Sequence, residues 1–84
     1  MSNYKTTLQK ILSGSSDANL RFSDIRNLLL HLGFDERVRG GHHLFRRRGV
    51  DEKINIQRDG AKAKPYQVRQ IRSILLKYHF GDSK

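Results

Sequence analysis

The chain has 84 residues, which indicates a single domain spanning 1–84, near the lower size limit for a self-sufficient core. It contains no cysteine, which excludes disulfides and thiolate metal sites and fits a reducing compartment. No apolar run approaches the roughly 18 residues of a membrane-spanning helix, and no signal pattern opens the chain, so we expect a soluble, cytoplasmic protein.

The formal net charge of +9 is unevenly distributed along the chain. Residues 1–35 carry four basic and three acidic side chains, residues 36–72 carry eleven and four, and residues 73–84 carry two and one, which gives +1, +7 and +1. Such a basic domain points to a polyanionic partner, most often nucleic acid. An acidic protein, an anionic membrane surface and plain solubility are the alternatives. The membrane is disfavoured because the basic residues do not line one face of a single helix.

The first third of the chain predicts two helices. Apolar residues at helical spacing indicate a short helix over 6–12, which ends at the break Ser13–Ser16. A longer helix is expected from Asp24 to Leu32, with Ser23 as its N-cap and Gly33 just beyond its end.

From Phe34 the apolar period changes from helical to alternating, which predicts strands. Gly40-Gly41 is typical of a hairpin turn, so strands over 34–39 and 42–47 should pair, and a third strand follows at 53–57. Residues 58–64 are expected to form a basic loop.

Pro65 suits the first turn of a last helix running to Tyr78. The sequence therefore predicts an α+β fold, in which two helices pack on one face of a three-stranded antiparallel sheet and a short extra helix precedes them.

The run from Arg39 to Arg48 carries the most chemistry. It holds two glycines, then His42 and His43, then an apolar pair followed by three arginines. Histidine exchanges protons near neutral pH, and the arginine fork matches phosphate geometry, so the run suggests RNA binding or RNA cleavage. We expect RNA contacts from the turn and from nearby basic residues, namely Arg39, Gly40, Gly41, Arg46, Arg47, Arg48, Lys53, Lys62 and Lys64.

Strand alternation separates the two histidines. It places His42, Leu44 and Arg46 on one sheet face and His43 with Phe45 on the other. Which face packs under the helices stays open, because Leu44 and Phe45 are both apolar. Adjacent strand residues cannot easily chelate one ion, so we expect no metal site and no cofactor.

Three segments together resemble the HicA family of bacterial toxins: Gly33-Phe34, then Gly40-Gly41-His42-His43-Leu44-Phe45, and then Arg72-Ser73-Ile74-Leu75. The similarity covers about residues 22–78, within a core of 22–80. It implies a double-stranded-RNA-binding-domain-like fold, α-β-β-β-α, and a ribosome-independent mRNA interferase held inactive by a cognate HicB antitoxin. It also implies that the essential histidine is His42, with His43 of lesser weight.

The chain departs from the family pattern in three places. Gly41 stands where many relatives have serine, and Gln57–Gly60 stands where a Pro-x-His segment is common, so a second histidine is missing there. Residues 1–20 extend beyond the minimal toxin and are expected to pack as an extra helix or to join the antitoxin interface.

Two other functions fit the same residues. A non-catalytic double-stranded-RNA-binding module reads A-form shape through phosphates and 2′-hydroxyls and needs no histidine. A protein-interaction module for an acidic antitoxin would have no affinity for RNA alone. The first hypothesis remains cleavage, in which a neutral His42 accepts the proton of the attacking 2′-hydroxyl.

Overall fold

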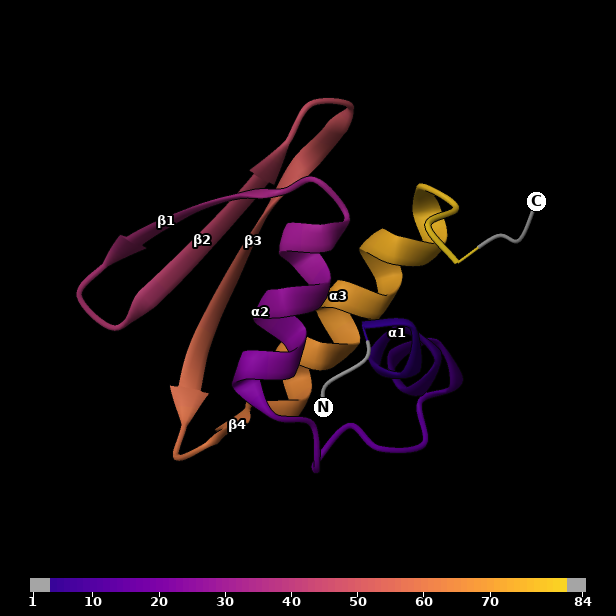
Figure 1. Ribbon diagram of the computed structural model, residues 1–84, viewed down its shortest axis with the longest axis vertical. Helices are drawn as coiled ribbons and strands as arrows, with labels where there is room; N and C mark the ends of the chain where they lie inside the picture. Colours follow the sequence, from indigo (N-terminus) through magenta and orange to yellow (C-terminus); the bar gives the residue numbers. More distant parts are fainter. Residues whose placement is uncertain (1–3, 82–84) are drawn as a thin grey trace.

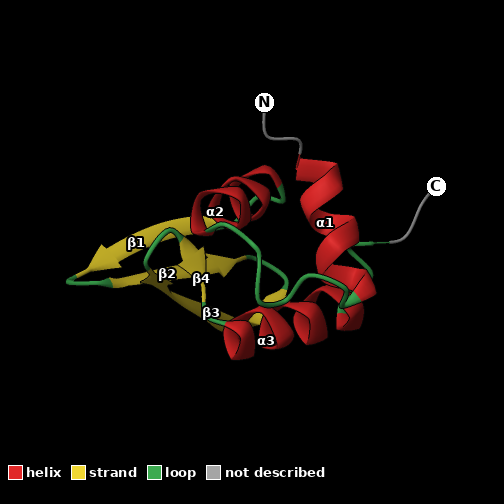
Figure 2. Cartoon of the chain, turned by 90° about the horizontal axis from the view of Figure 1, so that it is seen from below, coloured by secondary structure: helices red, strands yellow, loops and turns green. Residues whose placement is uncertain are grey.

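A computed structural model describes residues 4–81 as an α+β fold with three helices and a four-stranded antiparallel sheet of order β1-β2-β3-β4 (Figure 1). In chain order the elements are α1 (Tyr4–Ser13), α2 (Phe22–His31), β1 (Asp35–Arg39), β2 (His42–Arg47), β3 (Val50–Asp59), β4 (Lys62–Ala63) and α3 (Pro65–Lys77). Helices α2 and α3 cover one face of the sheet, and α1 lies beyond them, away from the strands (Figures 1 and 2).

Helix α2 begins two residues earlier than its sequence predicts. Its N-cap is Arg21, with extended backbone angles, and Ser23 lies inside the first turn, so the prediction of Ser23 as the cap was wrong. The helix starts early because Phe22 is completely buried and its N–H donates to Ala61 O at 3.0 Å. The predicted end was right: Gly33 has φ +92°, and the bonds from Gly33 N to Leu30 O and from Phe34 N to Leu29 O form a Schellman motif.

The sheet is larger than the expected three strands. The β1–β2 hairpin turns through Gly40-Gly41 as predicted, with positive φ at Gly40 only, the pattern of a type II′ turn. β3, however, extends over Val50–Asp59, and part of the expected basic loop is the short strand β4. β4 forms because Ala63 is buried, pairs with Arg58 and donates its N–H to Leu20 O at 3.0 Å.

The core lies between the sheet and the helices. It contains the apolar stripes of α2 and α3 and the helix-side residues of β2 and β3, with Phe45, Ile54 and Ile56 almost fully buried. The hairpin of β1 and β2 projects past the end of the helix layer (Figures 1 and 2). For that reason Val38 is 53% exposed although its partner in the register, His43, is on the helix side.

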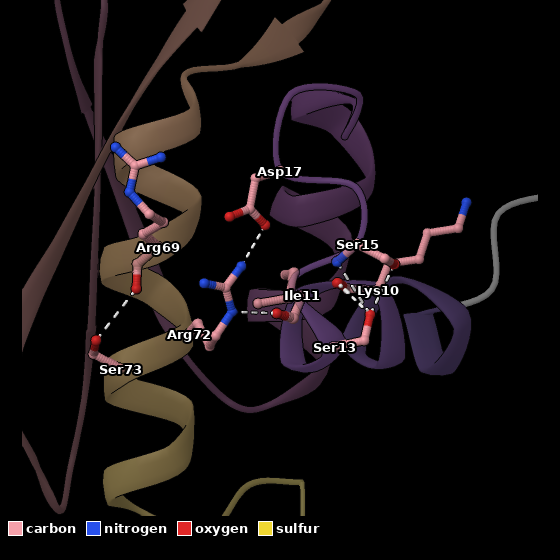
Figure 3. Close-up of polar contacts among 8 residues, drawn as sticks. All are labelled: Lys10, Ile11, Ser13, Ser15, Asp17, Arg69, Arg72 and Ser73. Carbon is pink, nitrogen blue, oxygen red and sulfur yellow. Dashed lines mark hydrogen bonds and ion pairs between the residues drawn. The ribbon is translucent and has the colours of Figure 1, made fainter.

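Arg72 of α3 holds the first helix in place. Its Nε donates to Ile11 O, the end of α1, at 2.6 Å, and its Nη2 pairs with the Asp17 carboxylate in the loop that follows (Figure 3). Ile11 is completely buried. Residues 4–20 are therefore packed against the body of the domain, which is one of the two roles expected for residues 1–20; residues 1–3 lie outside the described part of the chain.

Candidate functional site

The two adjacent histidines lie on opposite sides of β2. His43 pairs with Ile56 and faces the helices, whereas His42 pairs with Arg39 on one side and Gln57 on the other and is exposed on the outer face. The sequence did not show which face of β2 packs under the helices, and packing decides it. Phe45 is fully buried next to Ile54, and Leu44 lies on the outer face.

His43 is bound into the core by an acidic partner. Its Nδ1 lies 2.7 Å from Glu36 Oε2, and its ring meets Phe22 edge-on with centroids 4.6 Å apart. Arg26 donates to both oxygens of the same carboxylate, from Nε at 2.8 and 2.9 Å. The hydrogen bond from Arg26 holds the pKa of Glu36 below its ordinary value of 4.5. These contacts tie β1 and β2 to α2, which is a structural role for His43.

His42 is held at the surface by two amides of β3. Its Nδ1 lies 3.4 Å from Asn55 Oδ1, and its Nε2 lies 3.2 Å from Gln57 Nε2. Asn55 and Gln57 are two residues apart on one face of a strand, about 7 Å, so the ring is held between them. The arrangement orients the imidazole while leaving it open to a ligand from outside.

A cationic depression of about 690 Å³ lies on the outer face. His42 does not line it, but Arg39, the register partner of His42, does. Leu44, two residues further along β2, is part of its floor, and four basic side chains surround it. Its lining is Asp35, Glu36, Arg37, Arg39, Leu44, Arg46 and Lys53. The Glu36 carboxylate is engaged by Arg26 of α2, so Asp35 is the acidic side chain that offsets the four cations. We refer to Arg37, Arg39, Arg46 and Lys53 as the cationic face.

Three of the predicted RNA-contact residues lie on the cationic face: Arg39, Arg46 and Lys53. Gly40 and Gly41 lie beside it in the hairpin turn. Arg48 lies in the β2–β3 turn, at the far end of β2 from His42. Arg47 turns to the helix side, where its Nε donates to Leu32 O at 2.7 Å.

Lys62 and Lys64, the two RNA contacts predicted from the expected basic loop 58–64, lie at the other edge of the sheet. Lys62 Nζ donates to Asn19 Oδ1 at 3.3 Å, and Lys64 Nζ donates to Gln57 Oε1 at 3.4 Å. Lys64 is thereby connected to His42 through the Gln57 amide, whereas Lys62 contacts the loop before α2.

Sequence reasoning missed Arg37, Asn55 and Gln57. The signal for Arg37 was present, because a two-residue hairpin loop fixes the register and places Arg37 opposite Leu44. For Asn55 and Gln57, the alternating pattern predicts that they lie on the polar face of their strand, but it does not show which face of β2 lies on the same side of the sheet. That depended on Phe45 packing with Ile54.

Comparison of this chain with family models, with curated proteins and with solved structures finds no match in any of the three. Within residues 4–81, no group of three or more His, Asp or Glu side chains is placed to hold a metal ion. None of the helices described has the length and apolar character needed to cross a membrane.

Proposed function

We propose that this protein is an endoribonuclease of the HicA type, the toxin of a type II toxin–antitoxin pair that cleaves mRNA without the ribosome. The observation that carries the proposal is His42, an exposed imidazole held by two amides, whose register partner Arg39 belongs to the cationic face on the same side of the sheet. The order α2-β1-β2-β3-α3 supports a double-stranded-RNA-binding-domain-like core over 22–80, with β4 and α1 added to it.

The proposed reaction uses the RNA's own 2′-hydroxyl as nucleophile. His42 accepts the hydroxyl proton while the 2′-oxygen bonds to phosphorus and the bond from phosphorus to the 5′-oxygen breaks. The products are a 2′,3′-cyclic phosphate and a 5′-hydroxyl, whose proton comes from solvent or from the protonated ring. No metal takes part in this step, and DNA would be bound without being cut.

The cationic face would hold the phosphates around the scissile link. Guanidinium groups fixed on a strand give their donors to the phosphoryl oxygens as charge develops there. Arg39, the register partner of His42, is the nearest of the four along the sheet, and Arg46 lies about 13 Å from His42 along β2. The same surface, when covered by a HicB-like antitoxin, would be closed to RNA.

Cleavage of an end-labelled RNA by the purified protein in the presence of EDTA tests the proposal. His42→Ala should lower the rate by about 10²- to 10⁴-fold with an unchanged melting temperature. His31→Ala, an exposed histidine on α2 that stacks on Tyr4, is the matched control and should retain activity. RNA with a 2′-deoxy nucleotide at the cut position should stay intact there.

Other results would identify other functions. Binding of structured RNA without cutting would favour the non-catalytic double-stranded-RNA-binding module, and cutting that survives His42→Ala would remove His42 from the mechanism. Growth arrest on expression in bacteria, relieved by the neighbouring reading frame, tests the toxin–antitoxin assignment. Its absence with an active nuclease would leave the cleavage chemistry and refute the toxin role.

A further inference from the structure

A chain of polar side chains connects the start of α3 to the His42 ring. Lys64, the N-cap of α3, places Nζ 3.4 Å from Gln57 Oε1. The Nε2 of the same amide lies 3.2 Å from His42 Nε2, and His42 Nδ1 lies 3.4 Å from Asn55 Oδ1. Gln67, which is 5% exposed, accepts the Gln57 backbone N–H at 3.0 Å and anchors this part of β3 to α3.

The order of donors and acceptors along this chain has one solution. A lysine ammonium has no acceptor, so Gln57 must present its oxygen to Lys64 and its NH₂ group to His42. An NH₂ group has only donors, so His42 Nε2 must present a lone pair. The ring proton is then on Nδ1, where it is donated to Asn55 Oδ1.

We propose that Lys64 and Gln57 are positioning residues that hold neutral His42 in the tautomer with its proton on Nδ1 and its lone pair on Nε2. The inference rests on the proposed function, because it names Nε2 as the atom that receives the 2′-hydroxyl proton. A neutral histidine free of such contacts favours the opposite tautomer, with the proton on Nε2. Which nitrogen is protonated is decided by the partner of the other nitrogen.

The Gln57 amide occupies the place that the ribose hydroxyl takes. A hydrogen bond between neutral groups contributes only about 1 kcal/mol net, so the incoming hydroxyl can replace the amide at Nε2 at little cost. The Nδ1 side of the ring, which faces Asn55 Oδ1, is not displaced in the exchange and still favours the proton on Nδ1, unless Gln57 turns its oxygen toward Nε2. The lone pair is therefore already directed at the nucleophile when RNA arrives.

The tautomer is measured directly by nitrogen NMR of the His42 ring in the full-length protein at pH 8, where an unperturbed histidine is neutral. In the wild type, Nε2 should give the signal of an unprotonated ring nitrogen. Lys64→Met frees the Gln57 amide to turn and should shift the population toward protonated Nε2. Lys62→Met removes the same charge two residues away, where the lysine contacts Asn19, and should leave the signal unchanged.

Gln57→Glu replaces the NH₂ donor that faces His42 Nε2 with an acceptor oxygen and leaves the shape of the side chain almost unchanged. A carboxylate only accepts, so His42 Nε2 must then carry a proton, and its signal should become that of a protonated nitrogen. A wild-type protein with protonated Nε2 would overturn the inference, as would a Lys64→Met spectrum equal to the wild type or to that of Lys62→Met. The backbone bond from Gln57 to Gln67 persists in all these variants, so each should fold.

Cleavage kinetics separate this inference from the proposed function. In Lys64→Met, kcat should fall roughly 2- to 5-fold, in proportion to the fraction of competent tautomer lost. RNA cleavage that requires His42, together with protonated Nε2 in the wild type, would overturn the tautomer and leave the nuclease. The expected tautomer without any RNA cleavage would support the positioning role of Lys64 and Gln57 and would overturn the proposed nuclease activity.

Discussion

Replacing two residues of the cationic face should change how RNA binding depends on salt. We consider Arg46→Gln with Lys53→Gln, which lowers the net charge from +9 to +7 and removes two of the four cations that surround the depression. Both side chains are exposed on the outer face, so the substitutions should leave the core intact.

The magnitude follows from counterion release. If each of the four cations meets one phosphate, the slope of log K against log salt for single-stranded RNA is about −0.7 × 4 = −2.8, and the double variant has about −1.4. Between 50 and 200 mM salt, affinity should then fall about 50-fold for the intact face and only about 7-fold for the variant.

Fluorescence anisotropy of a labelled single-stranded RNA across this salt range measures the two slopes, in a His42→Ala background that keeps the RNA uncut. The control is Lys10→Gln with Arg69→Gln, which removes the same two charges from exposed positions on α1 and α3. The control should retain the steep slope. Equal slopes in the two double variants would mean that net charge, and not the cationic face, binds RNA.

Three further predictions concern the framework of the site. His43→Ala should lower the free energy of unfolding by about 2 kcal/mol and the melting temperature by roughly 8–16 °C, because it removes the hydrogen bond to Glu36 and the ring contact with Phe22. RNA cleavage by the folded variant should be retained, because His42 is unchanged. Glu36→Gln should lower the free energy of unfolding at pH 7. The pKa of Glu36 is lower in the folded state than its ordinary value of 4.5, so the ionised carboxylate stabilises the fold fully above pH 4.5. This stabilisation is lost as the pH falls through the lowered folded-state pKa. Urea unfolding at pH 7 and pH 3 should therefore show the two proteins converging in acid, and a constant difference would refute the assignment. Gly33→Ala should lower the free energy of unfolding by about 1–2 kcal/mol, because φ is +92° and the new Cβ would lie 3.2 Å from Arg47 Nε. Gly41→Ala is the control: its Cβ would meet no atom within 4 Å, so the melting temperature should not change.

The sequence determined the local elements wherever a short pattern carries its own physical cause. Gly33 ended α2, Gly40-Gly41 formed the hairpin, and Pro65 opened α3, because backbone freedom or restriction acts within a few residues. The pairing of His42 with Arg39 also follows from the length of the hairpin loop alone.

Only the tertiary structure decided which histidine faces solvent, because two apolar neighbours, Leu44 and Phe45, make both faces of β2 acceptable in isolation. The core accepts Phe45 beside Ile54, and that packing sends His43 to Glu36 and leaves His42 outside. It also brings Lys64, 22 positions away along the chain, into the cluster that holds the His42 ring. Contacts between residues distant in sequence depend on how the layers pack, and no local pattern encodes them.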